Sequence, residues 1–151
     1  MELDRNGLEV LSREECLRLL AGSVVGRVVV TDRALPAAFP VNFTLFDDDV
    51  VFLSSDGSKL EAVTTGQVVA FEVDEIDPRS QTGWSVLIQG WAGLIEDPAE
   101  LERARALGLQ PWAPRLPGQF VRIRSELVSG RRLLPPGRVR IDHRLEAAVV
   151  S

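Results

Sequence analysis

The chain is poor in the side chains that most often carry enzyme chemistry. Its 151 residues include one histidine, one cysteine and one lysine. The single histidine, His143, excludes a multi-histidine metal site and a serine triad within one chain, and we expect it to be a packed or tail residue. Neither a Gly-x-Gly-x-x-Gly sequence nor a P-loop is present, so no Rossmann or Walker site is indicated. We therefore predict no catalytic and no metal-binding side chain, and any chemistry has to come from a bound cofactor.

Long apolar runs are also absent. No run approaches the ~18 residues of a membrane span, and the N-terminal residues do not have the pattern of a signal peptide. A soluble, cytoplasmic protein is expected. The net charge of −5 argues against a nucleic-acid partner. The lone Cys16 cannot form an internal disulfide, and it lies in a helical leucine pattern where a buried thiol acts as a small hydrophobe.

The length predicts a single domain over residues 1–151. An N-terminal region, residues 1–24, contains a helix that begins after the capping box at Ser12 and ends at Gly22. A second helix follows Asp97, a good N-cap, and Gly108 ends it. Residues 135–151 form a C-terminal tail.

Six extended segments account for most of the remaining chain. They are rich in Val, Ile and Phe, and they cover residues 25–31, 37–46, 50–54, 68–73, 84–95 and 120–134, the last with a break near Gly130. Several are apolar on both faces, as at residues 86–88. A closed barrel whose outer face is covered by a second subunit explains this better than an open sheet. We expect a homodimer with an apolar interface of more than ~2,000 Å².

The only lysine lies in a turn that could bind an anion. An apolar strand ends in Ser54 and Ser55, and the chain then passes through Asp56, Gly57 and Ser58 to Lys59 at the start of a short helix. Hydroxyls, backbone N–H groups and the positive end of a helix dipole are what a phosphate needs. The alternative is an ordinary strand-to-helix turn with a solvated lysine, because Asp, Gly and Ser are common turn residues.

Two other charged clusters have structural interpretations. The acidic residues 47–49 stand between two strands and predict a solvated hairpin turn, not a metal site. Eight arginines occur between Arg115 and Arg144, against Glu126 and Asp142. This C-terminal part either lines an anionic site or forms a solvated, salt-bridged face.

Taken in order, several segments resemble one known family. They are Gly26-Arg27-Val28, Phe39-Pro40-Val41-Asn42-Phe43, the stretch from Ser54 to Leu60, Phe71-Glu72-Val73-Asp74, Gly83-Trp84-Ser85-Val86-Leu87-Ile88-Gln89-Gly90 and Val128-Ser129-Gly130-Arg131-Arg132. This order resembles the flavin-binding split-barrel proteins related to pyridoxamine 5′-phosphate oxidase, in particular the short actinobacterial members. The resemblance implies a mainly β fold, a six-stranded antiparallel split barrel with a few small helices. It also implies a homodimer that binds FMN, or in some branches the deazaflavin F420, between its subunits.

The resemblance also implies which residues hold the cofactor. Asn42 would lie along the edge of the flavin ring, and the turn residues would hold the phosphate. Trp84 and Ser85 would approach the cofactor, with Trp84 at the rim of the cleft, and Trp112 would cover it from the partner subunit. The complete set of expected cofactor-binding residues is Asn42, Ser54, Ser55, Ser58, Lys59, Leu60, Trp84, Ser85 and Trp112.

Two departures from the family pattern restrict which functions the resemblance predicts. Related short members often have an arginine just before the phosphate turn, where this chain has Leu53. The substrate signature of true pyridoxamine-phosphate oxidases is not recognisable in residues 138–151, so we do not expect that substrate. Three functions remain open: a flavin-dependent oxidoreductase acting on an unknown small molecule, a flavin carrier or sensor without turnover, and a structural dimer with a degenerate pocket.

Overall fold

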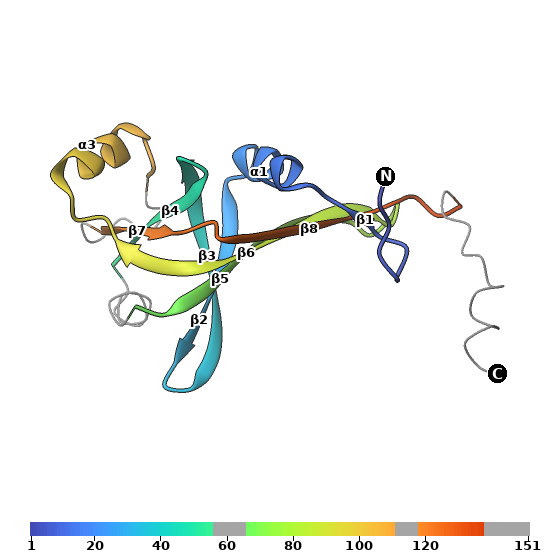
Figure 1. Ribbon diagram of the computed structural model, residues 1–151, viewed down its shortest axis with the longest axis horizontal. Coiled ribbons are helices and arrows are strands. Elements are labelled where there is room, and N and C mark those ends of the chain that lie inside the picture. Colours follow the sequence, from blue (N-terminus) through green and yellow to red (C-terminus); the bar gives the residue numbers. More distant parts are fainter. Residues whose placement is uncertain (56–65, 111–117, 138–151) are drawn as a thin grey trace.

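The computed structural model describes residues 1–55, 66–110 and 118–137 (Figure 1). The strands are β1 (Glu9–Val10), β2 (Val25–Asp32), β3 (Leu35–Phe46), β4 (Asp49–Ser54), β5 (Val68–Asp77), β6 (Thr82–Leu94), β7 (Gln119–Ile123) and β8 (Leu127–Leu133). The helices are α1 (Arg13–Ala21) and α3 (Pro98–Ala106). No helix in these three stretches is long and apolar enough to cross a membrane.

Six strands close into a barrel. In the order β2, β3, β4, β7, β6 and β5, each strand pairs antiparallel with the next, and β5 returns to β2. The predicted six-stranded antiparallel barrel is confirmed. β8 and β1 lie outside the ring, where β8 extends the sheet from β6 and β1 pairs with β8. In Figure 1 this extension runs away from the barrel, toward the N-terminus.

One edge of β6 serves two partners, and this produces the split. Its residues Gly83–Gln89 pair with β8, whereas Ala92–Leu94 pair with β7. Between them, Gly90 lies under the segment that joins β7 to β8. A Cβ at Gly90 would lie 1.9 Å from the carbonyl oxygen of Arg124. The two strands can therefore share one edge only because the crossing point has no side chain.

The predicted break near Gly130 is wrong in position. The last extended segment divides at residues 124–126, and Gly130 lies inside β8, paired with Val86. A Cβ at Gly130 would lie 2.6 Å from the sulfur of Cys16. This glycine is needed for the close packing of α1 on β8, not for a turn.

The main hydrophobic cluster fills the barrel and continues under α1. Its largest fully buried side chains include Phe52, Phe71 and Ile88, and α1 adds Leu20 and Cys16. Cys16 is completely buried, as predicted, and burial raises the pKa of its thiol. A second cluster, formed by Phe46, Val51, Ile95 and Ala104, packs α3 against the barrel.

The helix ends largely follow the sequence. The hydroxyl of Ser12 accepts the N–H of Glu15 at 3.1 Å, and Asp97 accepts the N–H of Glu100 at 3.0 Å. A capping box also requires the Glu15 carboxylate to accept the backbone N–H of Ser12. This part of the prediction is wrong, because the carboxylate accepts hydrogen bonds from Arg18 and Arg132. The same two bonds lower the pKa of Glu15 to about 2. α1 is thereby tied to β8 as well as capped.

Candidate functional site

Asn42 lies on β3 and holds a loop end in place. It pairs with Val25 of β2, and its side-chain amide donates a hydrogen bond to the carbonyl oxygen of Gln110, beyond α3. One N–H of the amide is thus used for structure. The Asn42 side chain is half-buried and lies on the outside of the barrel, because its neighbours Val41 and Phe43 point into the core.

The strand before the predicted phosphate turn ends where the sequence indicated. β4 ends at Ser54, which is buried and pairs with Gln119, and Ser55 is exposed. Leu53, at the position where relatives often have arginine, is half-buried and pairs with Phe120. Ser58, Lys59 and Leu60 lie outside the described residues, as does Trp112. The phosphate site therefore stays a prediction.

Trp84 and Ser85 point to opposite faces of β6. Val86 and Ile88 are buried, and half-buried Trp84 packs against the same cluster. This agrees with the predicted alternation. Ser85 lies on the other face, paired with Asp74 of β5 and Arg131 of β8. Trp84 thus belongs in part to the core, and its expected place at the rim of a cofactor cleft stays a prediction.

The side chains that point away from the barrel on four neighbouring strands form a continuous surface, which we call the outer sheet face. Its residues are Val25, Arg27 and Val29 of β2, Val68, Ala70, Glu72 and Asp74 of β5, Ser85, Leu87, Gln89 and Trp91 of β6, and Leu127, Ser129 and Arg131 of β8. Asn42 adjoins it through Val25. Since β6 and β3 are three strand spacings apart, Ser85 and Asn42 are separated by roughly 14 Å. They can border one extended ligand but cannot bind the same small group.

Arg27, Glu72 and Asp74 form a charged cluster within this face. One guanidinium nitrogen of Arg27 lies 3.3 Å from a carboxylate oxygen of each acid. Burial raises the pKa of the Glu72 carboxyl to about 7, and its hydrogen bond to Asp74 and the charge of Asp74 act in the same direction, against Arg27. The folded chain therefore holds a proton that an unfolded chain releases near pH 4.5, and ionising Glu72 lowers stability as the pH rises toward about 7.

This cluster was not predicted from the sequence. The signal available was the alternation of Phe71 and Val73 with Glu72 and Asp74, which places two acids on one face of a strand. Nothing local indicated that Arg27, 45 residues away from Glu72, would be their partner.

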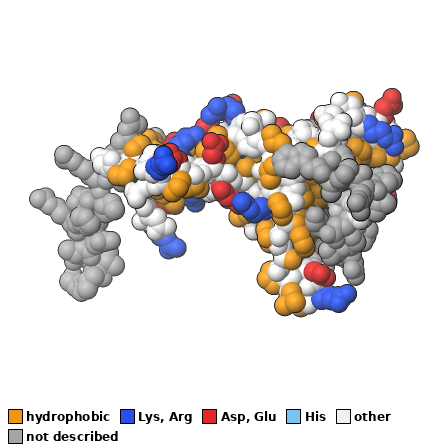
Figure 2. Space-filling model, turned by 180° about the vertical axis from the view of Figure 1, so that it is seen from behind, with side chains coloured by type: hydrophobic (Ala, Val, Ile, Leu, Met, Phe, Trp, Pro, Cys, Tyr) orange, Lys and Arg blue, Asp and Glu red, His pale blue; other side chains and the backbone are white. Residues whose placement is uncertain are grey.

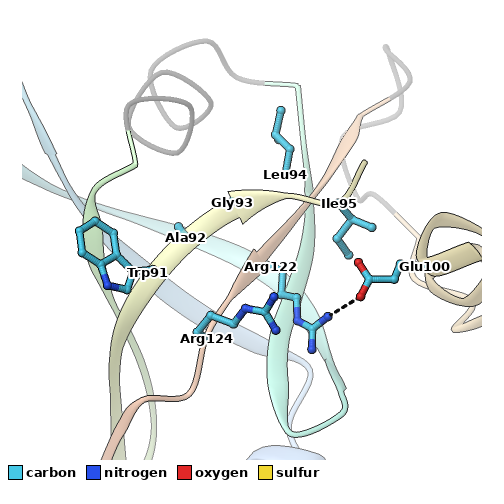
Figure 3. A pocket seen from close by; sticks show the side chains of 8 residues that line it. All are labelled: Trp91, Ala92, Gly93, Leu94, Ile95, Glu100, Arg122 and Arg124. Atoms are coloured by element: carbon cyan, nitrogen blue, oxygen red, sulfur yellow. Dashed lines mark hydrogen bonds and ion pairs between the residues drawn. The ribbon is translucent and has the colours of Figure 1, made fainter. Parts of the chain in front are cut away.

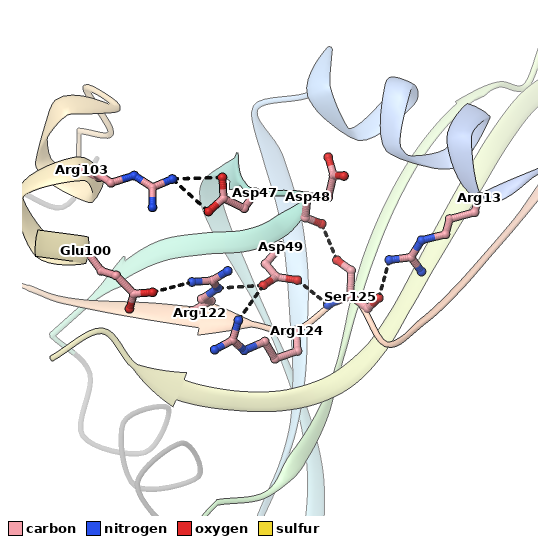
Figure 4. Close-up of polar contacts among 9 residues, drawn as sticks. All are labelled: Arg13, Asp47, Asp48, Asp49, Glu100, Arg103, Arg122, Arg124 and Ser125. Carbon is pink, nitrogen blue, oxygen red and sulfur yellow. Dashed lines mark hydrogen bonds and ion pairs between the residues drawn. The ribbon is translucent and has the colours of Figure 1, made fainter. Parts of the chain in front are cut away.

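Asp49 is the centre of a second polar network (Figure 4). Its carboxylate accepts from Arg122 at 2.7 Å, from Arg124 at 3.2 Å and from the N–H of Ser125 at 2.8 Å. The hairpin prediction is confirmed for Asp47 and Asp48, which form the turn with positive φ. The prediction of a solvated triplet is wrong for Asp49, because this side chain is only 13% exposed.

The C-terminal arginines in the described residues are salt-bridged, as one of the two interpretations predicted. Arg122 and Arg124 bind Asp49, Arg131 binds Asp4, and Arg132 binds Glu9 and Glu15. Phe46 packs against the guanidinium groups of Arg103 and Arg122, at 4.6 and 4.8 Å from its ring centre. These arginines fasten β7 and β8 to the rest of the molecule. The other four, Arg115, Arg138, Arg140 and Arg144, lie outside the described residues.

A small pocket opens beside this network (Figure 3). It is lined by Trp91, Ala92, Gly93, Leu94, Ile95, Glu100, Arg122 and Arg124, and its volume is about 160 Å³. This is below the roughly 300 to 1,000 Å³ of typical ligand sites. Arg122 is already paired with Asp49 and Glu100. Because of its size and its satisfied charges, this pocket is not a suitable place for a flavin.

A larger hollow lies at the far end of the sheet extension. It has a volume of about 530 Å³, and its lining is mostly apolar: Ile76, Asp77, Pro78, Gln81, Leu133, Leu134 and Pro136. Its lining comes from the tip of the β5–β6 hairpin and the end of β8. Asn42 and Ser54 belong to β3 and β4, and Figure 1 shows these strands in the barrel, away from that end of the sheet. Asn42 and Ser54 are therefore separate from this hollow, whereas Trp84 follows Gly83, which pairs with Ile76 and Leu133 of the lining.

Comparison with known proteins identifies the family of the chain, which the geometry alone does not. Residues 12–132 match the protein family described as pyridoxamine 5′-phosphate oxidase. The chain is 39% identical to the uncharacterised protein Rv0080 of Mycobacterium tuberculosis over 133 residues, which covers 85% of this chain and 87% of that protein.

Solved structures agree with this match. A FAD-binding protein from Mycobacterium smegmatis is 34% identical, with a TM-score of 0.70, and the alignment covers 83% of this chain and 100% of that one. A FAD-binding protein from Mesorhizobium loti is 25% identical, with a TM-score of 0.72, over 84% of this chain and 99% of that one.

Proposed function

Because the chain belongs to the pyridoxamine 5′-phosphate oxidase family of flavin-binding split barrels, we propose that it binds a flavin and acts as a flavin-dependent oxidoreductase on a small molecule. The observation that carries the proposal is the alignment with the FAD-binding protein of M. smegmatis over the whole length of that protein. A bound flavin would supply hydride or electron transfer, which the side chains of this protein do not offer.

The donors available on the barrel suit a flavin. Ser85 belongs to the outer sheet face and Asn42 adjoins it through Val25, so both offer polar groups on one side of the barrel. The exposed Ser55 follows the buried end of β4 and leads toward Ser58 and Lys59. We propose that the first pair lies along the ring and that the turn residues, with Leu60 next to them, hold the phosphate. Apolar side chains next to the ring would keep water from it, Trp84 would reach its rim from the opposite face of β6, and Trp112 would cover it.

We further propose a homodimer. The outer sheet face exposes large apolar side chains on all four of its strands, namely Val25, Val68, Trp91 and Leu127. Figure 2 shows hydrophobic side chains gathered over the barrel and the β2–β3 hairpin on one side of the molecule. Val68 and Trp91 are paired neighbours, and exposed apolar surface of this kind marks interaction sites in soluble proteins. Light scattering at micromolar concentration tests the assembly, and a monomer would contradict it.

The first test is the absorption spectrum of the purified protein. An oxidised flavin gives one band in the near ultraviolet and one in the visible range, and F420 gives a single band between them. Chromatography of the cofactor released by acid then identifies it as FMN, which the sequence resemblance favours, as FAD, which the two solved relatives bind, or as F420. A protein that binds none of the three when reconstituted would be the structural dimer.

Turnover is tested separately. In the absence of oxygen, an oxidoreductase is reduced by a nicotinamide donor and is reoxidised by its substrate. A protein that holds a flavin but exchanges electrons with neither is a carrier or sensor. Candidate substrates are small molecules other than pyridoxamine phosphate.

We expect Lys59→Ala to weaken flavin binding by about ten- to a hundredfold, because it removes a charge-assisted hydrogen bond worth roughly 1.5 to 3 kcal/mol. Isothermal titration with FMN, FAD and F420 measures the change. Arg79→Ala, which removes an exposed cation from the β5–β6 turn, is the matched control and leaves affinity unchanged. Equal affinity in the two variants would make Lys59 an ordinary turn residue.

A further inference from the structure

The outer sheet face carries a charge imbalance where β5 pairs with β2. Arg27 faces two acids, Glu72 and Asp74, and the three side chains together carry a net charge of −1 when all are ionised. The side chains of Glu72 and Asp74 are only 28% and 35% exposed in the single chain. Leu87 pairs with Glu72 and Ala70 precedes it on the same face, whereas the polar Ser85 pairs with Asp74. The exposed apolar side chains of Val68, Trp91 and Leu127 lie further along the face.

The neighbouring strands supply little that could balance this charge. On β6, Leu87 is opposite Glu72 and Ser85 is opposite Asp74, and neither ionises. On β2, Arg27 is the charged group, and Pro40 lies opposite it on β3. Arg131 of β8 lies in the same row as Asp74, one strand further away, and is bound to Asp4 at 3.0 Å. Among the described residues, the two acids therefore share Arg27 as their cation.

The neighbouring carboxyl groups of Glu72 and Asp74 retain one proton more readily than two carboxyl groups that are far apart in water. Like charges within hydrogen-bond reach disfavour double ionisation, and burial acts in the same direction. The raised pKa of Glu72, about 7, agrees with this geometry. A single proton neutralises the cluster, and the change falls within the physiological pH range.

We propose that the Glu72–Asp74 pair is a proton-binding site at which a second copy of this chain docks, and that protonation of the pair strengthens the dimer. The proposal rests on the homodimer proposed above. A two-fold interface has to be self-complementary. The exposed apolar side chains of the outer sheet face meet this condition. The charged clusters of two copies meet it better when each is neutral than as two net negative charges brought together without water.

The test is the dimer dissociation constant of the purified protein, with its cofactor, at about pH 6 and about pH 8. We expect the dimer to be roughly ten- to a hundredfold tighter at the lower pH, because one unit of pKa shift corresponds to tenfold per site and a two-fold dimer contains two such pairs. Sedimentation velocity over a dilution series measures the constant. For a dimer too tight to dilute apart, the rate of subunit exchange between two labelled batches replaces it, with slower exchange expected at about pH 6.

Two variants make the test specific. Glu72→Gln keeps the shape and removes the titrating group, so its dimer should be as tight as the low-pH wild type at both pH values. Glu75→Gln makes the same chemical change on the same strand, at an exposed position opposite Trp84 on the other face, and should keep the wild-type pH dependence. Circular dichroism checks that both variants are folded.

Each remaining outcome overturns a defined claim. A monomer at both pH values would contradict both the proposed homodimer and this proposal. A dimer whose dissociation constant and exchange rate do not change with pH, or a Glu72→Gln variant that keeps the wild-type pH dependence, removes this proposal alone. The flavin content of the same samples is measured independently, so a failure of flavin binding is seen separately.

Discussion

Replacing Gly90 by valine is expected to leave no stable barrel. The new Cβ would lie 1.9 Å from the carbonyl oxygen and 2.9 Å from the carbonyl carbon of Arg124. Both are backbone atoms of the segment that leads from β7 to β8, so no side-chain rotation relieves the clash. Either β7 or β8 has to leave the edge of β6. We expect a loss of more than about 5 kcal/mol, comparable to the whole stability of a small domain.

Far-UV circular dichroism and the soluble yield of Gly90→Val measure this effect. Gly93→Val is the matched control on the same strand, because a Cβ there meets nothing within 4 Å. Valine suits an extended backbone, and the control should remain within about 1 kcal/mol of wild type. If Gly90→Val unfolds at the same urea concentration as Gly93→Val, the crossing of the β7–β8 connection over β6 is wrong.

The second large effect is expected for Asp49→Asn. The amide keeps the size of the side chain but removes the negative charge between Arg122 and Arg124. The Arg122 side chain is only 11% exposed, so its charge becomes poorly compensated. Removing one partner of a buried pair costs roughly 3 to 5 kcal/mol, and we expect about 3 here because Glu100 still binds Arg122 at 3.3 Å.

The midpoint of urea unfolding measures the change. Asp47→Asn is the matched control from the same hairpin, where both side chains of the Asp47–Arg103 pair are 57% exposed. Exposed pairs contribute about 0 to 1 kcal/mol, and asparagine tolerates the positive φ of this turn. Equal losses for the two variants would show that Asp49 is as solvated as the sequence suggested.

Local signals in the sequence were sufficient for the elements themselves. The caps at Ser12 and Asp97 depend on hydrogen bonds within one helical turn, so residue type and spacing predict them. The alternation at Val86 and Ile88 predicts which face of a strand is buried, because that period is a property of the extended backbone. The family resemblance, tested against relatives, added the flavin-binding split barrel to this list.

Which of these elements contact one another depends on the tertiary structure. Gly90 is one of 12 glycines, and nothing near it in the sequence says that β7 and β8 meet there. The sequence likewise predicts a break of the strand near Gly130, although this glycine makes room for the sulfur of Cys16. A glycine needed for close approach and a glycine needed for a turn have the same local signature.

The same division explains the charged residues. The sequence determined that Asp47 and Asp48 form a turn, because turn preference is local, and that Glu72 and Asp74 share a strand face. Only the tertiary structure determines that Asp49 is shielded from water and bound to Arg122, 73 residues away. It also determines that Arg27 of β2 pairs with the two acids of β5. Burial and electrostatic pairing depend on segments distant in the chain, so strands and caps could be predicted from the sequence whereas ion-pair networks and proton-binding sites required the assembled barrel.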